Sequence, residues 1–262
     1  MRRLAIRPGA LGDFIVSLPA LEHLRTDYFE VWTASPHTPL VCFADRTRSI
    51  ASTGLDWIGV DSPPERLVAE LREFDSIVSW YGANRPEFRE AVAELGLPFE
   101  FFPAVPLPGA GADTSPRAAT ARERSCHAID FYLDQVGAKP GAVPRVHCEV
   151  SPENFAVIHP FSGSPRKNWP IEKYRGLASQ LQKIMPVRWC AGPEDPPLEG
   201  AVHINDLYEL ACWLARARLY IGNDSGVTHL AAAVGTPVLA LFGPTDPEVW
   251  APRGSNVRVA KW

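Results

Sequence analysis

Short apolar runs alternate with longer segments of helical periodicity along the whole chain. In the first half, four runs have the length of strands: 4–7, 29–33, 76–80 and 99–102. Apolar positions at helical spacing predict helices at 13–25, 64–73, 86–95 and 123–136. This alternation is typical of stacked βαβ units, which form parallel sheets.

The alternation starts again after a segment that looks like a linker, Lys139-Pro-Gly-Ala-Val-Pro-Arg145. Here the expected strands are 155–159, 187–191, 219–222 and 238–242, and the expected helices are 171–184, 207–217 and 225–234. We therefore predict an α/β fold of two Rossmann-like lobes, at 1–145 and 146–262. The cleft between such lobes is a favoured ligand site.

A stretch rich in proline and glycine, 103–117, has no periodicity. Proline and glycine break regular structure, so this stretch is expected to be a surface loop. Long loops in compact domains often serve as lids or binding loops. A plain insertion is the alternative.

Composition narrows the function class. The chain has 262 residues with a formal charge of −4, which gives no overall basic footprint for nucleic acid. The apolar run at the N-terminus is too short for a signal peptide, and no run of about 18 apolar residues occurs. A cytoplasmic protein is expected, and attachment to a membrane surface stays open.

The cysteines are odd in number and far apart, and they contain no C-x-x-C pair: Cys42, Cys126, Cys148, Cys190 and Cys212. This spacing argues against a disulfide framework and against a zinc site. We expect mostly buried thiols in a reducing compartment. No His, Asp or Glu cluster has the spacing of metal ligands.

Three polar loops follow expected strands, where ligands bind in α/β sheets. The first, Pro8-Gly-Ala-Leu-Gly12-Asp13, matches neither the dinucleotide fingerprint nor a Walker A loop. This weakens a nicotinamide oxidoreductase as a candidate. Asp13 can cap the helix that follows, or it can act as a general base toward a substrate hydroxyl.

The second loop, 159–170, is rich in hydroxyl groups and positive charge. Arg166 and Lys167 beside Ser162 and Ser164 can hold a diphosphate. The alternative is an exposed basic turn with Pro170 at the first helical position.

The third loop, Asn223-Asp-Ser-Gly226, leads into a helix. Free N–H groups at a helix start attract anions, and Gly226 lets a ligand approach the backbone. Asp224 can cap the helix or contact a sugar hydroxyl, since a carboxylate next to phosphate is unfavourable. His229 either has a structural role or leans back toward the ligand. The acidic turn Gly192-Pro-Glu194-Asp195 also follows a strand end, and a carboxylate there can bind a ribose or lie in a solvated turn.

Taken together, six segments resemble glycosyltransferase family 9, the heptosyltransferase family of lipopolysaccharide core assembly. They occur in the family's order at 9–13 with 18–21, 159–170, 222–232, 243–247 and 250–254. The resemblance implies a GT-B fold whose N-terminal lobe holds the acceptor and whose C-terminal lobe holds a sugar nucleotide. It also implies an inverting transfer without a metal ion or other cofactor.

Residue by residue, the resemblance makes Asp13 the catalytic base and Lys167 the partner of the donor diphosphate. Ser225 and Gly226 match the phosphate-contacting helix start, with Asp224 beside them, and Glu194 matches a ribose contact. We expect Gly12, Ser162, Ser164, Arg166 and His229 near the donor and Arg7 near the acceptor. ADP-heptose is the family's best-known donor, and a lipid-linked or core oligosaccharide is its usual acceptor.

Two other functions fit the same fold. One is a sugar-nucleotide epimerase or hydrolase, which needs no second substrate. The other is a non-catalytic sugar-nucleotide binding protein, because the chain ends at Trp262, before a terminal helix that would cross back to the first lobe. Arg2, Arg3 and Arg7 also suggest peripheral contact with the inner membrane.

Overall fold

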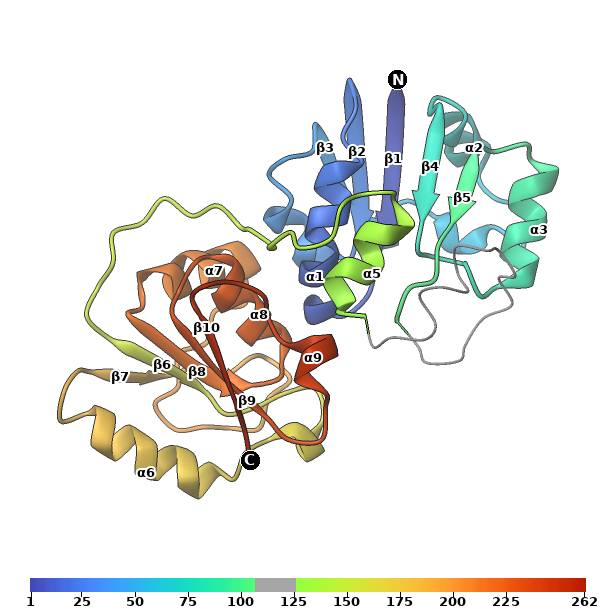
Figure 1. Cartoon of the computed structure of the whole chain (residues 1–262). Helices are drawn as coiled ribbons and strands as arrows, with labels where there is room; N and C mark the ends of the chain where they lie inside the picture. Colours follow the sequence, from blue (N-terminus) through green and yellow to red (C-terminus); the bar gives the residue numbers. More distant parts are fainter. Residues whose placement is uncertain (107–125) are drawn as a thin grey trace. The chain divides into compact units, whose positions relative to one another are not determined.

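The computed structural model describes residues 1–106 and 126–262, which group into two compact units (Figure 1). The first unit contains residues 1–10 and 17–140, and the second contains residues 11–16 and 141–262. Each unit holds one five-stranded sheet in which every pairing is parallel. The expected alternation of strands and helices is therefore confirmed in both units.

The sheet of the first unit has the strand order β3-β2-β1-β4-β5. Its strands are β1 (Arg2–Arg7), β2 (Tyr28–Thr33), β3 (Arg46–Ser49), β4 (Ser76–Ser79) and β5 (Phe99–Phe101). Its helices are α2 (Glu65–Leu71), α3 (Pro86–Glu94), α5 (Ala128–Gln135) and the second part of α1 (Leu11–His23), whose residues 11–16 group with the second unit. The 3-10 turns are η1 (Ser35–Leu40), η2 (Ile50–Ser52) and η3 (Leu55–Trp57).

Both faces of this sheet are covered. On one face, Leu4 and Ile6 of β1 pack in a cluster with Leu67 of α2 and Phe88 of α3. Ala5, which points to the other face, is equally buried. Helices α1 and α5 lie on that other face, in front of β1 in Figure 1. Burial on both faces explains why β1 reads as a continuous apolar run.

The sheet of the second unit has the order β10-β9-β8-β6-β7. Its strands are β6 (Ala156–His159), β7 (Val187–Trp189), β8 (Leu219–Asn223), β9 (Val238–Phe242) and β10 (Val257–Lys261). Its helices are α6 (Ile171–Leu181), α7 (Leu207–Arg216), α8 (Gly226–Ala233) and α9 (Pro247–Trp250), with a 3-10 turn η4 (Pro165–Lys167).

Helix α6 covers one face of the second sheet, where Tyr174 and Ala178 pack against Ile158 and Ile221. Helices α7 and α8 lie on the opposite side of the same sheet (Figure 1). Six residues of α8 are buried: the apolar residues Leu230 to Ala233, and also Thr228 and His229. Because β8 ends at Asn223 and α8 begins at Gly226, the start of α8 lies at the carboxyl edge of the sheet.

Two strands were not expected from the sequence. β3 is polar (Arg-Thr-Arg-Ser), and β10 alternates apolar and charged residues with mostly exposed side chains. Both are edge strands, which have a single neighbour and need no buried apolar face. The expected loop at 103–117 lies mostly outside the described residues, as does the start of the helix expected at 123–136.

The prediction of mostly buried thiols is wrong. All five cysteines lie among the described residues and none forms a disulfide, but only Cys190 is buried, and Cys42 is exposed. Cys42 lies between η1 and β3, outside the helices and strands that form the core. No helix of the described residues is long and apolar enough to cross a membrane.

Candidate functional site

The candidate site lies at the carboxyl edge of the second sheet. The chain passes from β6 to its neighbour β7 and then crosses back to β8 on the other side of β6. The direction of winding therefore reverses between β6 and β8. In open α/β sheets, ligands bind outside the carboxyl ends of the strands at such a reversal. The loops that follow β6, β8 and β9 all leave from this edge.

Asn223, the last residue of β8, fixes the loop after β6. Its side chain is fully buried, and its Oδ1 accepts hydrogen bonds from the Trp169 N–H and the Tyr174 hydroxyl, both at 2.9 Å. Its Nδ2 donates to the Pro160 carbonyl at 2.8 Å. Burial raises the pKa of Tyr174, so its hydroxyl remains a donor. One side chain thus ties the first and last parts of the loop to the sheet.

Asp224 is the centre of a charged cluster. Its Oδ2 lies 3.0 Å from Lys167 Nζ and 2.9 Å from Thr245 Oγ1, which donates to it. Its Oδ1 lies 4.0 Å from Nε2 of His229. Asp224 and His229 are both buried, whereas the Lys167 side chain keeps 26% of its exposure. The cluster presents one solvent-accessible cation beside a buried carboxylate.

Ser225, not Asp224, caps α8. The Ser225 side chain accepts a hydrogen bond from the Thr228 N–H at 3.4 Å. Asp224 has its carboxylate turned to Lys167 and Thr245, so the alternative that Asp224 caps this helix is wrong. The first N–H groups of a helix have no partner within the helix, so the start of α8 favours a negative ligand. Lys167 adds a positive charge next to it.

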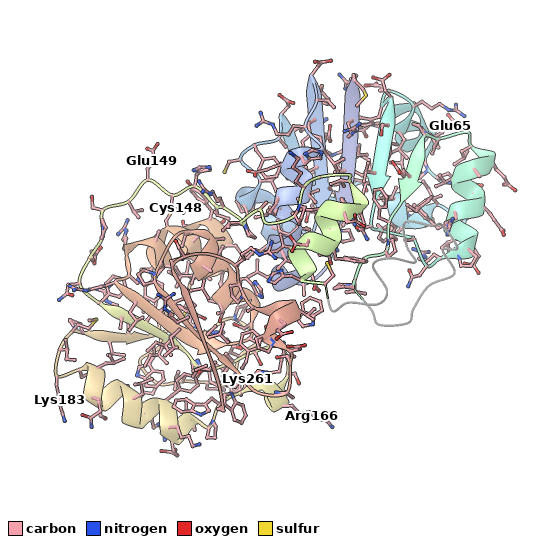
Figure 2. All side chains as sticks on the ribbon, viewed as in Figure 1. Glu65, Cys148, Glu149, Arg166, Lys183 and Lys261 are labelled. Atoms are coloured by element: carbon pink, nitrogen blue, oxygen red, sulfur yellow. The ribbon has the colours of Figure 1, made fainter. Side chains whose placement is uncertain are left out.

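A hydroxyl group within the loop after β6 stabilises the turn of that loop by hydrogen bonds. Ser162 Oγ lies 2.8 Å from the Ser164 carbonyl oxygen and 2.7 Å from Asn168 Oδ1. Arg166 is exposed and, as Figure 2 shows, extends away from the ribbon. Pro170 precedes α6 as its cap rather than standing at the first helical position. Of the two basic residues, only Lys167 is held in the cluster.

Residues 11–16 group with the second unit, and within it Gly12 lies next to the start of α8. A Cβ atom on Gly226 would lie 2.8 Å from Cβ of Leu11 and 3.0 Å from the Gly12 nitrogen. Only glycine permits this approach. Asp13 lies in the first turn of α1, and Ala10 is the cap residue, so the alternative that Asp13 caps the helix is wrong. Expecting the helix to begin at Asp13 misplaced its start by two residues.

The turn after β7 carries two acidic residues, Glu194 and Asp195, whose environments differ. Glu194 is exposed. Asp195 accepts hydrogen bonds from His159 Nε2 at 2.9 Å and from the Gly192 N–H at 2.6 Å. The sequence motif contained Asp195, but its pairing with His159 was missed. Spacing along the chain gave no signal for this pair, because the pair depends on β6 and β7 being neighbours in the sheet.

Arg7, the residue expected near the acceptor, belongs to the first unit and is 2% exposed. Its guanidinium donates to Ser17 Oγ at 3.2 Å, to the Pro8 carbonyl at 2.8 Å and to the Tyr132 hydroxyl at 2.8 Å. It also lies over the Tyr132 ring. These contacts tie the end of β1 to α1 and α5.

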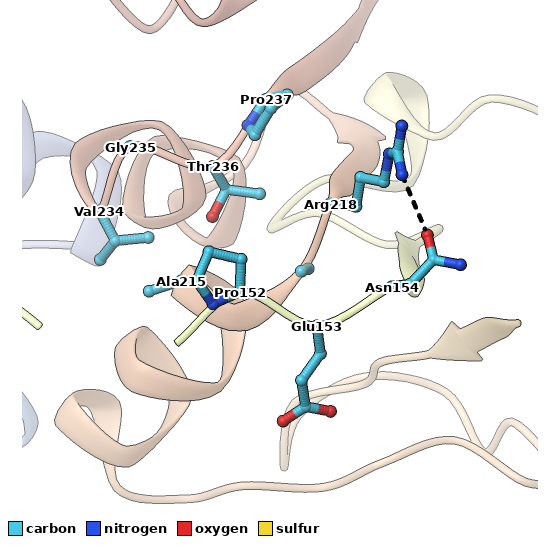
Figure 3. A pocket seen from close by; sticks show the side chains of 10 residues that line it. Pro152, Glu153, Asn154, Ala215, Arg218, Val234, Gly235, Thr236 and Pro237 are labelled. Carbon is cyan, nitrogen blue, oxygen red and sulfur yellow. Dashed lines mark hydrogen bonds between the residues drawn. The ribbon is translucent and has the colours of Figure 1, made fainter. Parts of the chain in front are cut away.

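A hollow lies at the opposite, amino edge of the second sheet (Figure 3). Its volume is about 510 Å³, and its lining includes Pro152, Asn154, Thr236 and Pro237. None of the candidate site residues lines it. In residues 1–106 and 126–262, no group of three His, Cys, Asp or Glu side chains is arranged to hold a metal ion.

The chain is similar to known proteins. The model of glycosyltransferase family 9 (heptosyltransferase) matches residues 119–261, more than half of the chain. Lipopolysaccharide heptosyltransferase 3 of Escherichia coli (strain K12) is 31% identical over 121 residues, which cover 40% of this chain and 35% of that protein. Lipopolysaccharide core heptosyltransferase OpsX of Haemophilus influenzae is 24% identical over 297 residues, covering 94% of this chain and 80% of that protein. This chain spans about a third of the first relative's length.

A solved structure gives the fold. The Escherichia coli ADP-heptose LPS heptosyltransferase II matches with a TM-score of 0.71 at 17% identity, over 99% of this chain and 90% of that chain. At this identity the likeness shows the fold alone. The predicted fold class, a GT-B type built of two Rossmann-like lobes, is confirmed.

Proposed function

Because the chain belongs to glycosyltransferase family 9 (heptosyltransferase), we propose that it is an inverting, metal-independent glycosyltransferase. The donor is a nucleotide-diphosphate sugar, ADP-heptose foremost, and the acceptor is a hydroxyl of the lipopolysaccharide core or another glycan. The observation that carries this proposal is the place of Lys167, whose Nζ is held by Asp224 one residue before the cap of α8.

The donor diphosphate would bind at the start of α8. There the N–H groups of Gly226 and its neighbours and the ammonium group of Lys167 can share the two phosphates. Ser162, Ser164, Ser225 and Arg166 add hydrogen-bond donors around this point. Asp224 and His229 would face the sugar, and Glu194 the ribose. The heptosyltransferase II that shares the fold is named for ADP-heptose, which supports this donor.

Asp13 would be the general base. The acceptor oxygen attacks the anomeric carbon, and the bond from that carbon to the diphosphate oxygen breaks. Asp13 takes the hydroxyl proton, and the nucleoside diphosphate leaves with the electron pair. Negative charge grows on the leaving group, where Lys167 and the α8 N–H groups would stabilise it. Gly12, packed against Gly226, supports a place for Asp13 close to that helix start.

The acceptor and its location follow from the same family. Lipid-linked or core oligosaccharide acceptors would bring the protein to the cytoplasmic face of the inner membrane as a peripheral protein. Of the three N-terminal arginines, Arg2 is exposed and supports this contact, whereas Arg7 is buried. Arg7 would act at the acceptor only through the shape of the loop that it holds.

The first test is a calorimetric titration of the protein with ADP, UDP, GDP and CDP, with and without EDTA. We expect ADP to bind, EDTA to leave its affinity unchanged, and Lys167→Ala to weaken it by about 10- to 100-fold, the range seen for lost charged contacts. Lys183→Ala, which removes an exposed lysine just after the C-cap of α6, is the matched control. Binding of no nucleotide, or equal loss in both variants, would reject the donor site.

Product analysis then separates the reactions. With ADP-heptose and a core oligosaccharide, a transferase gives an extended glycan. Release of free sugar in the absence of acceptor would instead indicate a hydrolase, and an altered donor an epimerase. Tight binding without turnover with any acceptor would indicate a binding protein.

A further inference from the structure

His159 and Asp195 form a buried pair at the base of two loops. His159 is the last residue of β6 and is 3% exposed, and its Nε2 lies 2.9 Å from Asp195 Oδ2. Asp195 closes the turn that follows the neighbouring strand β7. The pair therefore joins the start of the loop 160–169 to the turn 192–195, which carries Glu194.

The same carboxylate oxygen also shapes the turn itself. It accepts the Gly192 N–H at 2.6 Å, and a Cβ atom on Gly192 would lie 3.3 Å from it. Burial raises the pKa of Asp195, but the hydrogen bonds from His159 and Gly192 outweigh this, so the pKa lies below its usual range. An ionised carboxylate requires His159 to donate from Nε2. His159 Nδ1 is buried with no hydrogen-bond partner, so this one bond fixes the ring.

We propose that His159 and Asp195 are a positioning pair that holds Glu194 for the ribose of the nucleotide. The inference rests on the proposed function, because it assigns the turn after β7 to the nucleoside half of the donor. Neither residue contacts the ligand. Their hydrogen bond keeps the turn in one conformation before the nucleotide binds. Without this bond the turn becomes ordered only on binding, and this ordering lowers the affinity.

The diphosphate half is held by different contacts. Lys167 is fixed by Asp224, and the loop 160–169 is fixed by Asn223. None of these hydrogen bonds involves His159 or Asp195. Breaking the pair should therefore weaken recognition of the nucleoside and leave recognition of the phosphates unchanged.

The experiment compares ADP with inorganic pyrophosphate, which lacks the nucleoside. His159→Phe keeps a ring and removes the donor, and His159→Gln keeps an N–H group. We expect His159→Phe to weaken ADP binding by about 10-fold and His159→Gln by much less, with pyrophosphate affinity unchanged in both. Glu194→Gln should give the same ADP-specific loss, and adding His159→Phe to it should cause no further loss.

The outcomes separate the two hypotheses. The positioning role is overturned, and the proposed function stands, if the wild type binds ADP but His159→Phe lowers the affinities for ADP and pyrophosphate equally. The same conclusion follows if His159→Phe lowers neither affinity. If the wild type binds no nucleoside diphosphate, both are overturned. Should His159→Phe fail to fold, Asp195→Ala breaks the same bond from a surface turn, and circular dichroism melting checks that the variant is folded.

Discussion

Single buried polar residues decide the shape of the candidate site. Asn223 satisfies two groups of the loop after β6 and the Tyr174 hydroxyl of α6, and Asp224 holds Lys167 and Thr245. A buried polar group without a partner is destabilising by about 1–3 kcal/mol, so these contacts restrict the loop to one conformation. The Lys167 ammonium is thereby held in position before a ligand arrives.

At the residue scale, the proposed role of Asp13 as general base can be tested directly. Asp13→Asn keeps the size of the side chain and removes its basicity. We expect ADP binding to be unchanged and sugar transfer to fall by about 100-fold or more, because general-base catalysis contributes that much. Single-turnover measurement of glycan extension is the readout. Full transfer activity in Asp13→Asn would remove Asp13 from the role of base.

His37 predicts a pH dependence of stability. Burial, together with the charge of Arg7, lowers the pKa of His37 to about 4 from the ordinary 6.5. Between these values the unfolded chain binds a proton that the folded protein excludes, so stability is complete above pH 6.5 and falls as the pH drops toward 4. From pH 7 to pH 5 this loss amounts to about 2 kcal/mol.

Urea unfolding at pH 7 and pH 5 checks the effect of His37. His37→Gln should reduce the difference between the two free energies of unfolding, and His23→Gln, at an exposed position, should not. An equal pH dependence in wild type and His37→Gln would show that other groups cause it.

At the scale of elements, the beginnings of helices carry the site. α8 begins directly after β8, with Ser225 as its cap and Gly226 as its first residue. Parallel βαβ connections bring such helix starts to the carboxyl edge of the sheet, so their N–H groups and positive dipole ends face the ligand. The short β8–α8 connection leaves Asp224 as the one residue between strand and cap.

Comparing Ser225 with Thr236 distinguishes an effect on folding stability from an effect on ADP binding. Ser225→Ala should lower the free energy of unfolding by about 1 kcal/mol and also weaken ADP binding, while Ser225→Thr should keep most of both. Thr236→Val, at the opposite edge of the sheet, removes a buried hydrogen bond to the Leu214 carbonyl. It should also lower the free energy of unfolding by about 1 kcal/mol, but it should leave the ADP affinity unchanged. Chemical denaturation and calorimetry measure both quantities. A loss of ADP affinity in Thr236→Val would show that the two effects are not separable.

At the scale of the whole molecule, the two sheets have similar strand orders but different polar residues at their carboxyl edges. In both, the chain crosses from one side of the first strand to the other, between β1 and β4 and between β6 and β8. The second sheet has Asn223, Asp224 and Lys167 at this point. The first has Arg7, whose donors are engaged with Ser17, Pro8 and Tyr132. Of the described basic residues at these two crossing points, Lys167 keeps 26% of its side-chain exposure and Arg7 is buried, so the second sheet offers the accessible cation.

Hydrogen exchange locates the bound nucleotide on this larger scale. ADP should slow exchange in 160–169, 192–195 and 223–228, because ligand binding suppresses local opening of the segments that it contacts. The hollow at the amino edge, around 152–154 and 234–237, should exchange at its ligand-free rate. Protection of the amino edge alone would move the nucleotide site there.

The sequence by itself determined the alternation of strands and helices, the family and the candidate loops. These follow from local patterns: buried parallel strands read as apolar runs, and ligand loops read as glycine and hydroxyl residues at strand ends. The polar edge strands β3 and β10 have no such pattern, and tertiary pairing alone places them.

Only the tertiary structure decided which polar residues meet. It showed that Ser225 caps α8, that Asp224 pairs with Lys167 across 57 positions, and that His159 bonds Asp195 across 36. Which residue caps a helix depends on where the backbone angles become helical, and this point can shift by one residue. Which distant residues form a pair depends on strand order. Neither is encoded in spacing along the chain, because the order β8-β6-β7 is fixed by packing of the whole sheet.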